Sequence, residues 1–407
     1  MQLQNKYSIM DNFFKKIVFF FIVLNTFHSY SNSFVEIALQ NSRNNPGQIK
    51  TGADNFEKYL PLLKNKTVGI VTNQTGILTN KIHLVDFLIE EKIKIQTIFA
   101  PEHGFRGTAD AGEHIVDAQD SKTGLSIVSL YGDNRKPKSG QLKGIEIMIF
   151  DLQDVGARFY TYISTLHYVM EACAENQIPL LVLDRPNPNG DIVDGPILEK
   201  EYTSFVGMHP VPLLHGMTIG EYAQMINGEN WLKNSAKCKL TVIPCLNYNR
   251  KMSYSLLVKP SPNLPNDQSI NLYASLCLFE GTNISVGRGT EKQFQIYGSP
   301  SLPKSEFFFT PKPNFGAKEP LYNGQLCYGE DLTSYKKLSR LELQWLINAY
   351  KMTPNKTKFF NSFFTKLAGT KKLQQQIESG TSENKIRKSW KKDLNEYKNI
   401  RAKYLLY

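Results

Sequence analysis

Short apolar runs that alternate with longer amphipathic stretches constrain the fold of this 407-residue chain more than any other feature. Such runs predict buried strands, and they lie at residues 68–72, 95–100, 125–130, 145–150, 178–183 and 240–243. Between them, residues 81–92 and 162–176 predict helices, the first with Val85 and Leu88 on its apolar face. Apolar strands that alternate with helices are typical of a parallel sheet covered on both faces. The predicted class is α/β, with a Rossmann-like, mostly parallel sheet.

The length and composition predict more than one domain. With 41% hydrophobic and 21% charged residues, the chain is neither disordered nor a coiled coil, and at roughly 150 residues per domain it holds two or three domains. A Pro- and Asn-rich passage at residues 260–266 indicates a connection between them. We therefore expect a Rossmann-like domain at residues 34–258 and a smaller α/β domain at residues 259–407.

The amino terminus has the layout of a secretory signal peptide. Lys15 and Lys16 precede an apolar run at residues 17–24, and three serines follow, the last of them Ser33. The run is too short to span a membrane, which takes about 20 residues. We therefore expect a cleaved signal peptide at residues 1–33, a periplasmic or secreted protein, and no stable membrane insertion after cleavage.

Polar side chains directly follow most of the predicted strands. They are Asn73, Glu102, Asp151 with Asp154, and Asp184 with Arg185. The carboxyl ends of parallel strands meet at one edge of a sheet, where α/β proteins bind their ligands. Asp and Asn at such positions also cap helices, an alternative that accounts for one or two of these residues. The whole set predicts a polar crevice at this edge.

The turn at residues 101–107 brings an acid, an imidazole and a guanidinium together at the end of a strand. Such a turn aims Glu102 into a cleft, with His103 and Arg106 beside it as candidate binding residues. The alternative is a surface glutamate paired with Arg106. Because loops at this edge usually carry function, the turn favours a catalytic role for Glu102.

The densest cluster of polar and aromatic residues follows the fourth of these strands. Its candidate site residues are Asp151, Asp154, Arg158, Tyr160 and Tyr162. Carboxylates and Arg bind hydroxyl and acid groups through charge-assisted hydrogen bonds, and Tyr rings pack on the faces of sugars. One aspartate could instead pair with Arg158 as a buried structural ion pair. We expect at least one aspartate to be catalytic or to bind the ligand.

A Pro-rich turn at residues 184–190 adds candidates after the next strand. Its prolines fix the backbone, so that Asp184, Arg185 and Asn187 can line the same crevice. A plain Asx or Pro turn is the alternative.

The Gly-rich segment at residues 281–291 supplies the last candidates. It matches neither a Walker loop nor a dinucleotide fingerprint. Its glycines permit close approach of a ligand, and Arg288 is placed to bind a carboxylate. Asn283 and Glu291 complete the candidate binding set.

Several other classes of protein lack their signatures here. His103, His114, His209 and His215 show no metal-binding spacing, and no GxSxG elbow is present. The five cysteines form no CxxC pair, which argues against a zinc site and a disulfide framework. We therefore expect no metal and no cofactor.

The net charge of +11 comes from the carboxy-terminal part of the chain. Residues 331–407 hold 17 Lys and Arg against 6 Asp and Glu, an excess of 11. This indicates an anionic partner or simply a solvated surface. No nucleic-acid-binding signature accompanies it, so nucleic acid is not an expected partner. Nothing in the sequence indicates the oligomeric state.

Five segments together resemble one family, the bacterial exo-beta-N-acetylmuramidases, formerly a domain of unknown function. They are residues 69–76, the PEHG turn at 101–104, and residues 151–162, 184–188 and 280–290. The resemblance implies a Rossmann-like domain and a smaller carboxy-terminal domain that closes the active-site cleft. It also implies that the protein releases N-acetylmuramic acid from the non-reducing ends of peptidoglycan fragments, with Glu102 as a catalytic carboxylate. The segment after Pro320 carries few motif residues.

The chemistry of glycoside cleavage agrees with that resemblance. It needs an acid to protonate the leaving oxygen and a second group at the oxocarbenium-like centre. Glu102 is the expected acid, and Asp154 or Asp151 is the expected second carboxylate unless the substrate's own acetamido group serves. Two rivals remain: a non-catalytic protein that binds peptidoglycan or another sugar, and a metal-dependent hydrolase that uses His103 and the aspartates.

Muramic acid differs from glucosamine by a lactyl ether that bears a carboxylate. A site that selects muramides needs a cation for it, preferably Arg, whose planar fork makes two parallel hydrogen bonds. Arg288 is the first candidate because its flanking glycines allow close approach. Arg158 and Arg185 are the other candidates, although Arg158 could instead brace an aspartate.

Overall fold

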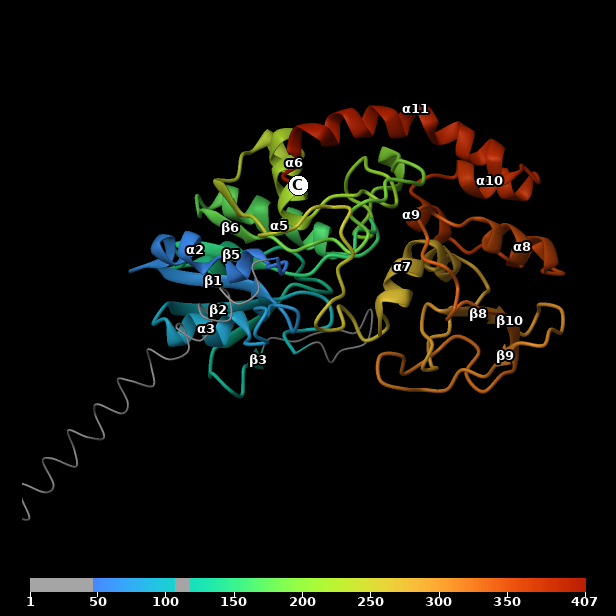
Figure 1. The fold of residues 1–407 in the computed structure, drawn as a ribbon, viewed down its shortest axis with the longest axis horizontal. Helices are drawn as coiled ribbons and strands as arrows, with labels where there is room; N and C mark the ends of the chain where they lie inside the picture. The colour runs from blue at the N-terminus through green and yellow to red at the C-terminus, as the bar shows by residue number, and fades with distance from the viewer. Residues whose placement is uncertain (1–46, 107–117) are drawn as a thin grey trace, which may run out of the picture. The chain divides into compact units, whose positions relative to one another are not determined.

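The computed structural model describes residues 47–106 and 118–407, and the expected signal peptide lies outside them. Its main element is a seven-stranded sheet in the order β3-β4-β2-β1-β5-β6-β7 (Figure 1). The strands are β1 (Thr67–Thr72), β2 (Lys94–Ala100), β3 (Ala118–Gln119), β4 (Ser126–Ser129), β5 (Ile147–Asp151), β6 (Leu180–Leu183) and β7 (Leu240–Ile243). All neighbours pair in parallel except β3 and β4. The expected α/β class and mostly parallel sheet are confirmed.

The strand order explains where a ligand can bind. The chain places β2 and β4 on one side of β1, then crosses over and adds β5, β6 and β7 on the other side. This is the order of a doubly wound Rossmann sheet, in which the loops diverge and leave a crevice at the carboxyl ends of the central strands. Glu102 follows β2, and Asp151 is the last residue of β5.

Helices cover both faces of the sheet because alternate strand residues are apolar on both sides. One face, with Val68 and Ile70 of β1, packs against α2 (Phe56–Leu63) and α3 (Leu84–Glu90). The other face packs against α5 (Tyr162–Glu175) and α6 (Ile219–Gly228). A single-turn helix, α4 (Ser139–Leu142), precedes β5.

Helix α3 is shorter than the expected helix at residues 81–92. Lys81 has φ of 68°, in the left-handed region that a helix cannot continue through. The His83 ring then caps the helix, since its Nδ1 accepts from the Val85 N–H at 3.2 Å. Apolar spacing alone therefore placed the start of this helix too early.

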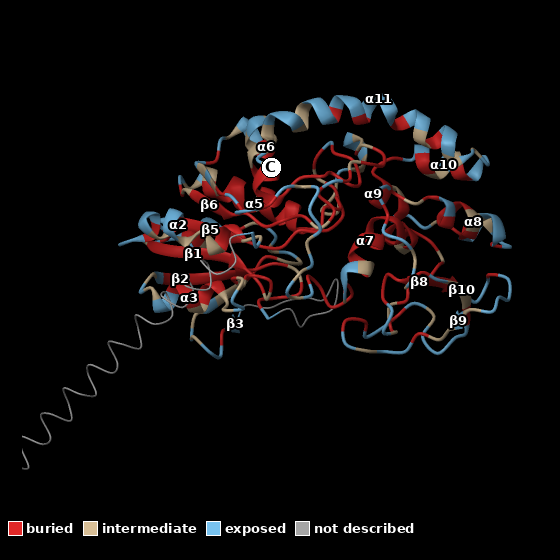
Figure 2. Ribbon diagram, viewed as in Figure 1, coloured by how far each residue is buried: buried red, intermediate tan, exposed pale blue. Residues whose placement is uncertain are grey.

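The carboxy-terminal half adds a small antiparallel sheet and a set of helices. Helix α7 (Asp267–Leu276) leads into the sheet, which has the order β8-β10-β9. The remaining elements are β8 (Ile296–Ser299), β9 (Phe308–Phe309), β10 (Cys327–Asp331), α8 (Gln344–Met352), α9 (Phe364–Ala368), α10 (Lys372–Glu378) and α11 (Glu383–Arg401). Their apolar residues join the cluster that covers the α5 and α6 face of the large sheet (Figure 2). The two halves therefore share one core.

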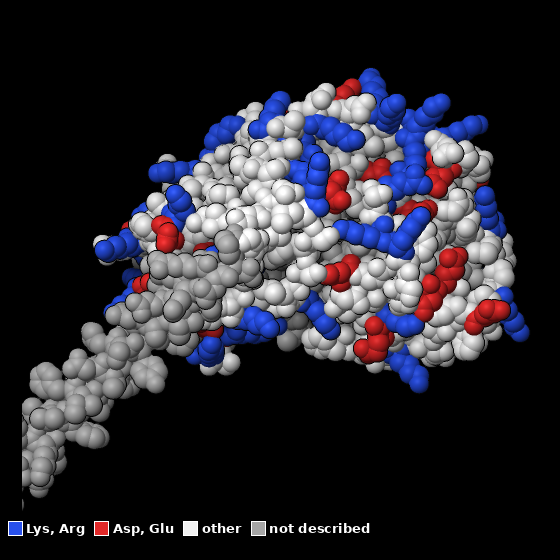
Figure 3. Space-filling model, in the orientation of Figure 1, with Lys and Arg blue, Asp and Glu red and all other residues white. Residues whose placement is uncertain are grey.

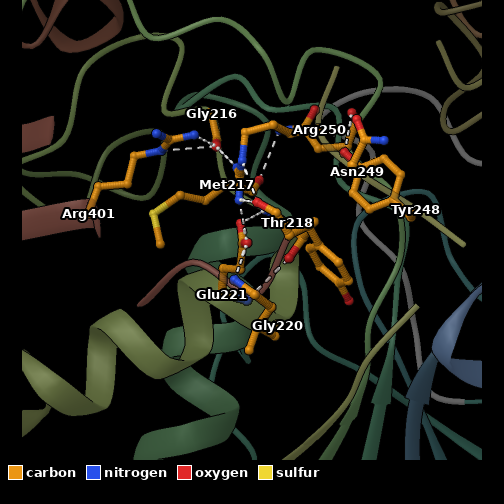
Figure 4. Close-up of polar contacts among 12 residues, drawn as sticks. Gly216, Met217, Thr218, Gly220, Glu221, Tyr248, Asn249, Arg250 and Arg401 are labelled. Atoms are coloured by element: carbon orange, nitrogen blue, oxygen red, sulfur yellow. Dashed lines mark hydrogen bonds and ion pairs between the residues drawn. The ribbon is translucent and has the colours of Figure 1, made fainter. Parts of the chain in front are cut away.

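The last helix runs back over the amino-terminal half. The Tyr397 hydroxyl donates to the carbonyl of His215 at 2.7 Å. Arg401 Nε donates to the carbonyl of Gly216 at 3.0 Å (Figure 4). At its other end, Arg387 pairs with Asp194 at 2.8 Å. Segments far apart in sequence are thus held at both ends of α11.

The segment beyond α11 is anchored at the start of α6. Thr218 and Glu221 form a capping box there, as the Thr-x-x-Glu spacing suggests. Glu221 also pairs with Arg250 at 2.8 Å and accepts from the backbone N–H of Leu406 at 2.7 Å (Figure 4). One buried carboxylate therefore caps a helix and holds the end of the chain.

The outer face of α11 is exposed and basic. Lys385, Lys388, Lys391, Lys392 and Lys398 lie on it, and Figure 3 shows Lys and Arg side chains gathered over this part of the molecule. In the described part of the chain, none of the helices combines the length and the apolar character needed to cross a membrane.

Candidate active site

A cavity of about 540 Å³ lies at the carboxyl edge of the large sheet. It is lined by residues from both halves of the chain, which are Glu102, His103, Tyr131, Arg135, Phe159, Tyr160, Thr161, Ser204, Phe205, Val206, Ser261, Asn263, Leu264, Tyr273, Cys277, Glu280, Arg288, Phe294, Phe363, Lys366 and Leu367. Its volume falls in the usual range for small-molecule sites. The sheet edge that the sequence indicates is therefore one wall of a real cavity.

Glu102 lies on this wall, at the first turn after β2. Its position depends on a tight turn in which His103 and Gly104 have φ of 72° and 76°, and the Gly104 N–H donates to the carbonyl of Pro101 at 3.0 Å. His103 is buried and lines the cavity as well. The turn thus presents a carboxylate to the cavity from a fixed backbone.

Two hydroxyl-bearing side chains lie at the Glu102 carboxylate. Thr161 Oγ1 donates to Glu102 Oε2 at 2.9 Å, and Tyr131 lies near enough for the Glu102 charge to act on its phenol. Burial and the nearby Glu102 charge raise the pKa of Tyr131, so its phenol stays protonated. Hydrogen bonds to a charged group are the stronger kind, so the carboxylate is well oriented.

A second carboxylate of the described lining, Glu280, is ion-paired. Arg288 donates to Glu280 Oε1 from Nε at 2.8 Å and lies within 2.7 Å of it through Nη2. Cys277 Sγ contacts the other oxygen at 3.3 Å. The Arg288 guanidinium also lies 5.3 Å from the centre of the Phe294 ring. This part of the cavity therefore carries a compensated pair of charges.

Aromatic rings form much of the remaining wall. Tyr273 packs edge-on against Phe159, Tyr160 and Phe294, with ring centres 5.0–6.0 Å apart. The Tyr160 hydroxyl donates to the carbonyl of Pro260 at 2.7 Å, which links the first half of the chain to the loop before α7. Such a wall suits the apolar face of a sugar ring.

Of the residues expected from the sequence, Glu102, His103, Tyr160 and Arg288 line the cavity. The others do not, and most are occupied by contacts within the protein. Asp151 is fully buried and binds Arg185 through two hydrogen bonds, from Nε at 2.6 Å and from Nη2 at 2.9 Å. This buried pair braces the loop after β6 against the end of β5, so neither residue is left to bind a ligand.

Arg158, another residue of the expected binding set, lies outside the described cavity lining. It is fully buried and donates to the carbonyls of Pro196, Val211, Leu367 and Ala368 at 2.7–3.0 Å. Burial lowers its pKa to about 9. It pairs with no aspartate among the described residues, so the alternative of a buried Asp–Arg158 ion pair is wrong as well. Arg158 instead joins α9 to the amino-terminal half.

Asp154 lies behind the cavity wall. It is buried, accepts from the Gly156 N–H at 2.7 Å, and lies 3.4 Å from His215 Nε2. Its Oδ1 has no partner among the described residues. The carboxylate expected to complete the catalytic pair is therefore not part of the described cavity lining.

Asp184 is also enclosed by protein groups. It accepts from Thr218 Oγ1, the Tyr407 hydroxyl and the N–H groups of Arg185 and Gly220 at 2.7–2.9 Å. Burial raises its pKa to about 7. Its role in the structure is to join the end of β6 to α6 and to the last residue of the chain.

The remaining expected residues are likewise outside the cavity lining. Asn73 donates to the Tyr162 hydroxyl at 2.7 Å, and Asn187 donates to the carbonyl of Met217 at 2.9 Å. The carbonyl of Asn283 accepts from Tyr322 at 2.8 Å. Glu291 is exposed. Arg106 is 43% exposed and pairs with Asp120.

Several lining residues were missed from the sequence. Tyr131 directly follows the strand predicted at residues 125–130, so the rule that selects polar residues after strands also applies to it. Thr161 and Glu280 lie inside motifs that were noted, but no role was given to them. Arg135 and Lys366 carry no sequence signal of their own, because loops and a distant helix bring them to the cavity.

The histidines do not form a metal centre with other ligands in the described chain. No group of three or more His, Cys, Asp and Glu side chains in residues 47–106 and 118–407 is placed to hold a metal ion. His209 is buried against His167, with 2.9 Å between ring nitrogens, and His114 lies outside the described residues. All five cysteines are buried and free.

Comparison with known proteins agrees with the fold and with the motifs. A model of the amino-terminal part of exo-beta-N-acetylmuramidase NamZ matches residues 68–268, and a model of its carboxy-terminal part matches residues 271–407. The chain is 42% identical over 383 residues to the peptidoglycan beta-N-acetylmuramidase NamZ of Bacillus subtilis (strain 168), covering 88% of this chain and 92% of that protein. The domain boundary expected after residue 258 stays a prediction.

Two solved structures of DUF1343 family proteins from Bacteroides fragilis NCTC 9343 have the same fold. One is 45% identical with a TM-score of 0.82 and covers 88% of this chain and 99% of its own. The other is 29% identical with a TM-score of 0.75 and covers 89% and 99%. The resemblance read from the motifs is thereby confirmed, and the chain belongs to the exo-beta-N-acetylmuramidase NamZ family.

Proposed function

We propose that this protein is an exo-acting glycoside hydrolase that releases N-acetylmuramic acid from the non-reducing ends of peptidoglycan fragments. The observation that carries the proposal is Glu102, a carboxylate that accepts from Thr161 on the wall of a cavity lined in large part by aromatic rings. Membership of the family supports the same reaction. The two rivals, a sugar-binding protein and a metal-dependent hydrolase, draw no comparable support.

Glu102 is the general acid of this proposal. A carboxylic acid at this position protonates the glycosidic oxygen as the bond to the anomeric carbon breaks. Thr161 holds its side chain in one orientation, which keeps the proton in line with the leaving oxygen. The leaving group departs as an alcohol with this proton while the nucleophile assigned below bonds to the anomeric carbon, and water then displaces that nucleophile and gives a proton back to Glu102.

The second catalytic group comes from the substrate. Asp151 and Asp154 are buried behind the cavity wall, and Glu280 is neutralised by Arg288. Apart from Glu102 and Glu280, the described lining holds no carboxylate. N-acetylmuramic acid carries an acetamido group next to its anomeric carbon, and substrate-assisted hydrolases use this group as the nucleophile. We therefore assign the nucleophile to the acetamido oxygen.

The direct test uses two chromogenic substrates with the same leaving group, a beta-N-acetylmuramide and a beta-N-acetylglucosaminide. The proposal expects release of the chromophore from the muramide, with a much lower kcat/KM for the glucosaminide. Binding of the muramide without turnover would favour the sugar-binding rival. Loss of turnover after exhaustive chelation, restored by a metal ion, would favour the metal-dependent hydrolase.

The same proposal includes a location outside the cytoplasmic membrane. Its support is the layout of residues 1–33, with two lysines, an apolar run and three serines. We expect the mature protein to begin shortly after Ser33 and to occur in the periplasm or the medium. Amino-terminal sequencing of the native protein checks this, and recovery of Met1 or Met10 would contradict it.

A further inference from the structure

We infer that Arg135, rather than Arg288, is the cation that binds the lactyl carboxylate of the substrate. The inference rests on the proposed function, because only a muramide brings this carboxylate into the cavity. It also revises the candidate that the sequence favoured. Three cations line the described cavity, Arg135, Arg288 and Lys366, and the charges around them separate their roles.

Arg288 is already committed to an acid. Its Nε and Nη2 both lie within 2.8 Å of Glu280 Oε1, and the side chains of the two residues are 25% and 24% exposed. A carboxylate that approached Arg288 would also approach the negative charge of Glu280, so the pair offers little net attraction. Arg288 is therefore better suited to holding Glu280 as a hydrogen-bond acceptor for sugar hydroxyl groups.

Arg135 has no such partner. No ion pair joins it to another residue in the described part of the chain, and its side chain reaches the cavity from an exposed loop position. Its guanidinium lies over the ring of Phe205, 4.6 Å from the ring centre. This cation–π contact holds the plane of the guanidinium at the cavity wall. The guanidinium of Arg135 is therefore held in place without an acidic partner in the described part of the chain, as a binding site for a substrate carboxylate requires.

The position of Arg135 also fits the geometry of the sugar. The loop that leaves β4 carries both Tyr131, whose phenol the Glu102 charge acts on, and Arg135 four residues later. The positive charge of Arg135 acts on Tyr131, which places it near the acid. The scissile bond and the lactyl group are on the same sugar ring, two carbons apart. One loop thus supports the acid and the carboxylate-binding cation for a single residue of the substrate.

Lys366 is the remaining cation of the described lining. It belongs to α9 in the carboxy-terminal half and is exposed. Its flexible ammonium makes a point contact, whereas Arg135 presents a planar fork that matches both oxygens of a carboxylate. Lys366 therefore serves as the internal alternative in the experiment.

The experiment compares kcat/KM for the muramide and the glucosaminide in the wild type and in Arg135→Ala, Arg288→Ala and Lys366→Ala. Losing a hydrogen bond to a charged group reduces binding about 10- to 100-fold, so Arg135→Ala should lose this factor on the muramide and little on the glucosaminide. Arg288→Ala should lower both rates alike. Lys143→Ala removes an exposed positive charge away from the cavity and should change neither.

A third substrate isolates the carboxylate itself. In the amide of the muramide, the lactyl group is neutral while its size is nearly unchanged. The wild type should lose about as much kcat/KM on this amide as Arg135→Ala loses on the acid, and Arg135→Ala should treat acid and amide alike. Arg135→Lys should recover part of the preference for the acid.

Several outcomes would overturn the inference without touching the proposed function. If Arg135→Ala keeps the preference for acid over amide while Arg288→Ala or Lys366→Ala loses it, that residue binds the carboxylate. If the wild type cleaves neither glycoside, the proposed function fails instead. Calorimetry with free N-acetylmuramic acid and N-acetylglucosamine then still decides the inference, which expects tighter binding of the acid by the wild type than by Arg135→Ala.

Discussion

At the scale of single residues, the orientation of Glu102 depends on a side chain from another element. Thr161, the residue before α5, donates to its carboxylate at 2.9 Å, and Tyr131, in the loop after β4, lies near enough for the Glu102 charge to act on its phenol. Thr161 is free for this task because its side chain makes no capping hydrogen bond to α5. The acid is therefore held by contacts that can be removed without removing a helix cap.

Replacing Glu102 with Gln removes the proton donor but keeps the shape of the side chain. We expect kcat to fall roughly 10²- to 10⁴-fold, the usual range for loss of a general acid, with little change in the affinity for substrate. Steady-state kinetics on a muramide with a poor leaving group checks this. Glu291→Gln is the matched control and should keep wild-type rates, because Glu291 is exposed and outside the cavity lining. Equal losses in the two variants would contradict the assignment.

Thr161→Val tests the positioning of the acid. The change removes the donor 2.9 Å from Glu102 and keeps the volume of the side chain. Since a hydrogen bond to a charged group contributes about 1.5–3 kcal/mol, kcat should fall by one to two orders of magnitude while KM and thermal stability stay near wild type. A drop in melting temperature with unchanged kcat would show instead that Thr161 stabilises the fold.

At the scale of elements, Arg158 fixes the position of α9. It binds two carbonyls of the loops at Pro196 and Val211 and two carbonyls in α9. Gly369 allows this close approach, because a Cβ atom there would lie 2.4 Å from Arg158 Nη2. The helix that supplies Lys366 and Leu367 to the cavity is therefore held in place by a buried cation.

Arg158→Met separates this structural role from the binding role expected from the sequence. The variant leaves four buried carbonyls without their donor, and each buried group left unpaired costs about 1–3 kcal/mol. We expect a loss of at least about 3 kcal/mol in the free energy of unfolding, measured with a chemical denaturant. A wild-type free energy of unfolding combined with a raised KM would show instead that Arg158 binds the substrate.

The strands could be predicted from the sequence because each is a short apolar run, and the cavity edge followed from them. Which strand-end side chains face the cavity could not be predicted, because the answer depends on distant partners. Asp151 is occupied by Arg185, 34 residues later, and Asp184 by Tyr407, 223 residues later. Glu102 differs because it lines the cavity while it accepts a hydrogen bond from Thr161 Oγ1. The spacing of residues within a short stretch of sequence does not show which distant residues will pair with them.

At the scale of the whole molecule, the buried carboxyl of Asp184 joins the two halves and makes the stability of the folded protein depend on pH. It receives hydrogen bonds from the start of α6 and from Tyr407 at the other end of the described chain. Burial raises its pKa from 3.8 to about 7 in the folded protein. Between these two values the folded state binds more protons than the unfolded state does, so stability falls as the pH rises.

Asp184→Asn tests this coupling. The amide keeps an oxygen for the N–H groups of Arg185 and Gly220, and its nitrogen can donate to the hydroxyls of Thr218 and Tyr407. The wild-type contribution is present below about pH 4 and is lost as the pH rises through about 7, by an amount on the order of a few kcal/mol. Unfolding by denaturant should therefore show the variant gaining stability relative to the wild type between pH 5 and pH 8. Asp393→Asn changes an exposed position on α11, so its free energy of unfolding should follow that of the wild type over the same pH range. A constant difference between Asp184→Asn and the wild type would mean that Asp184 stays ionised throughout, with its four donors outweighing its burial.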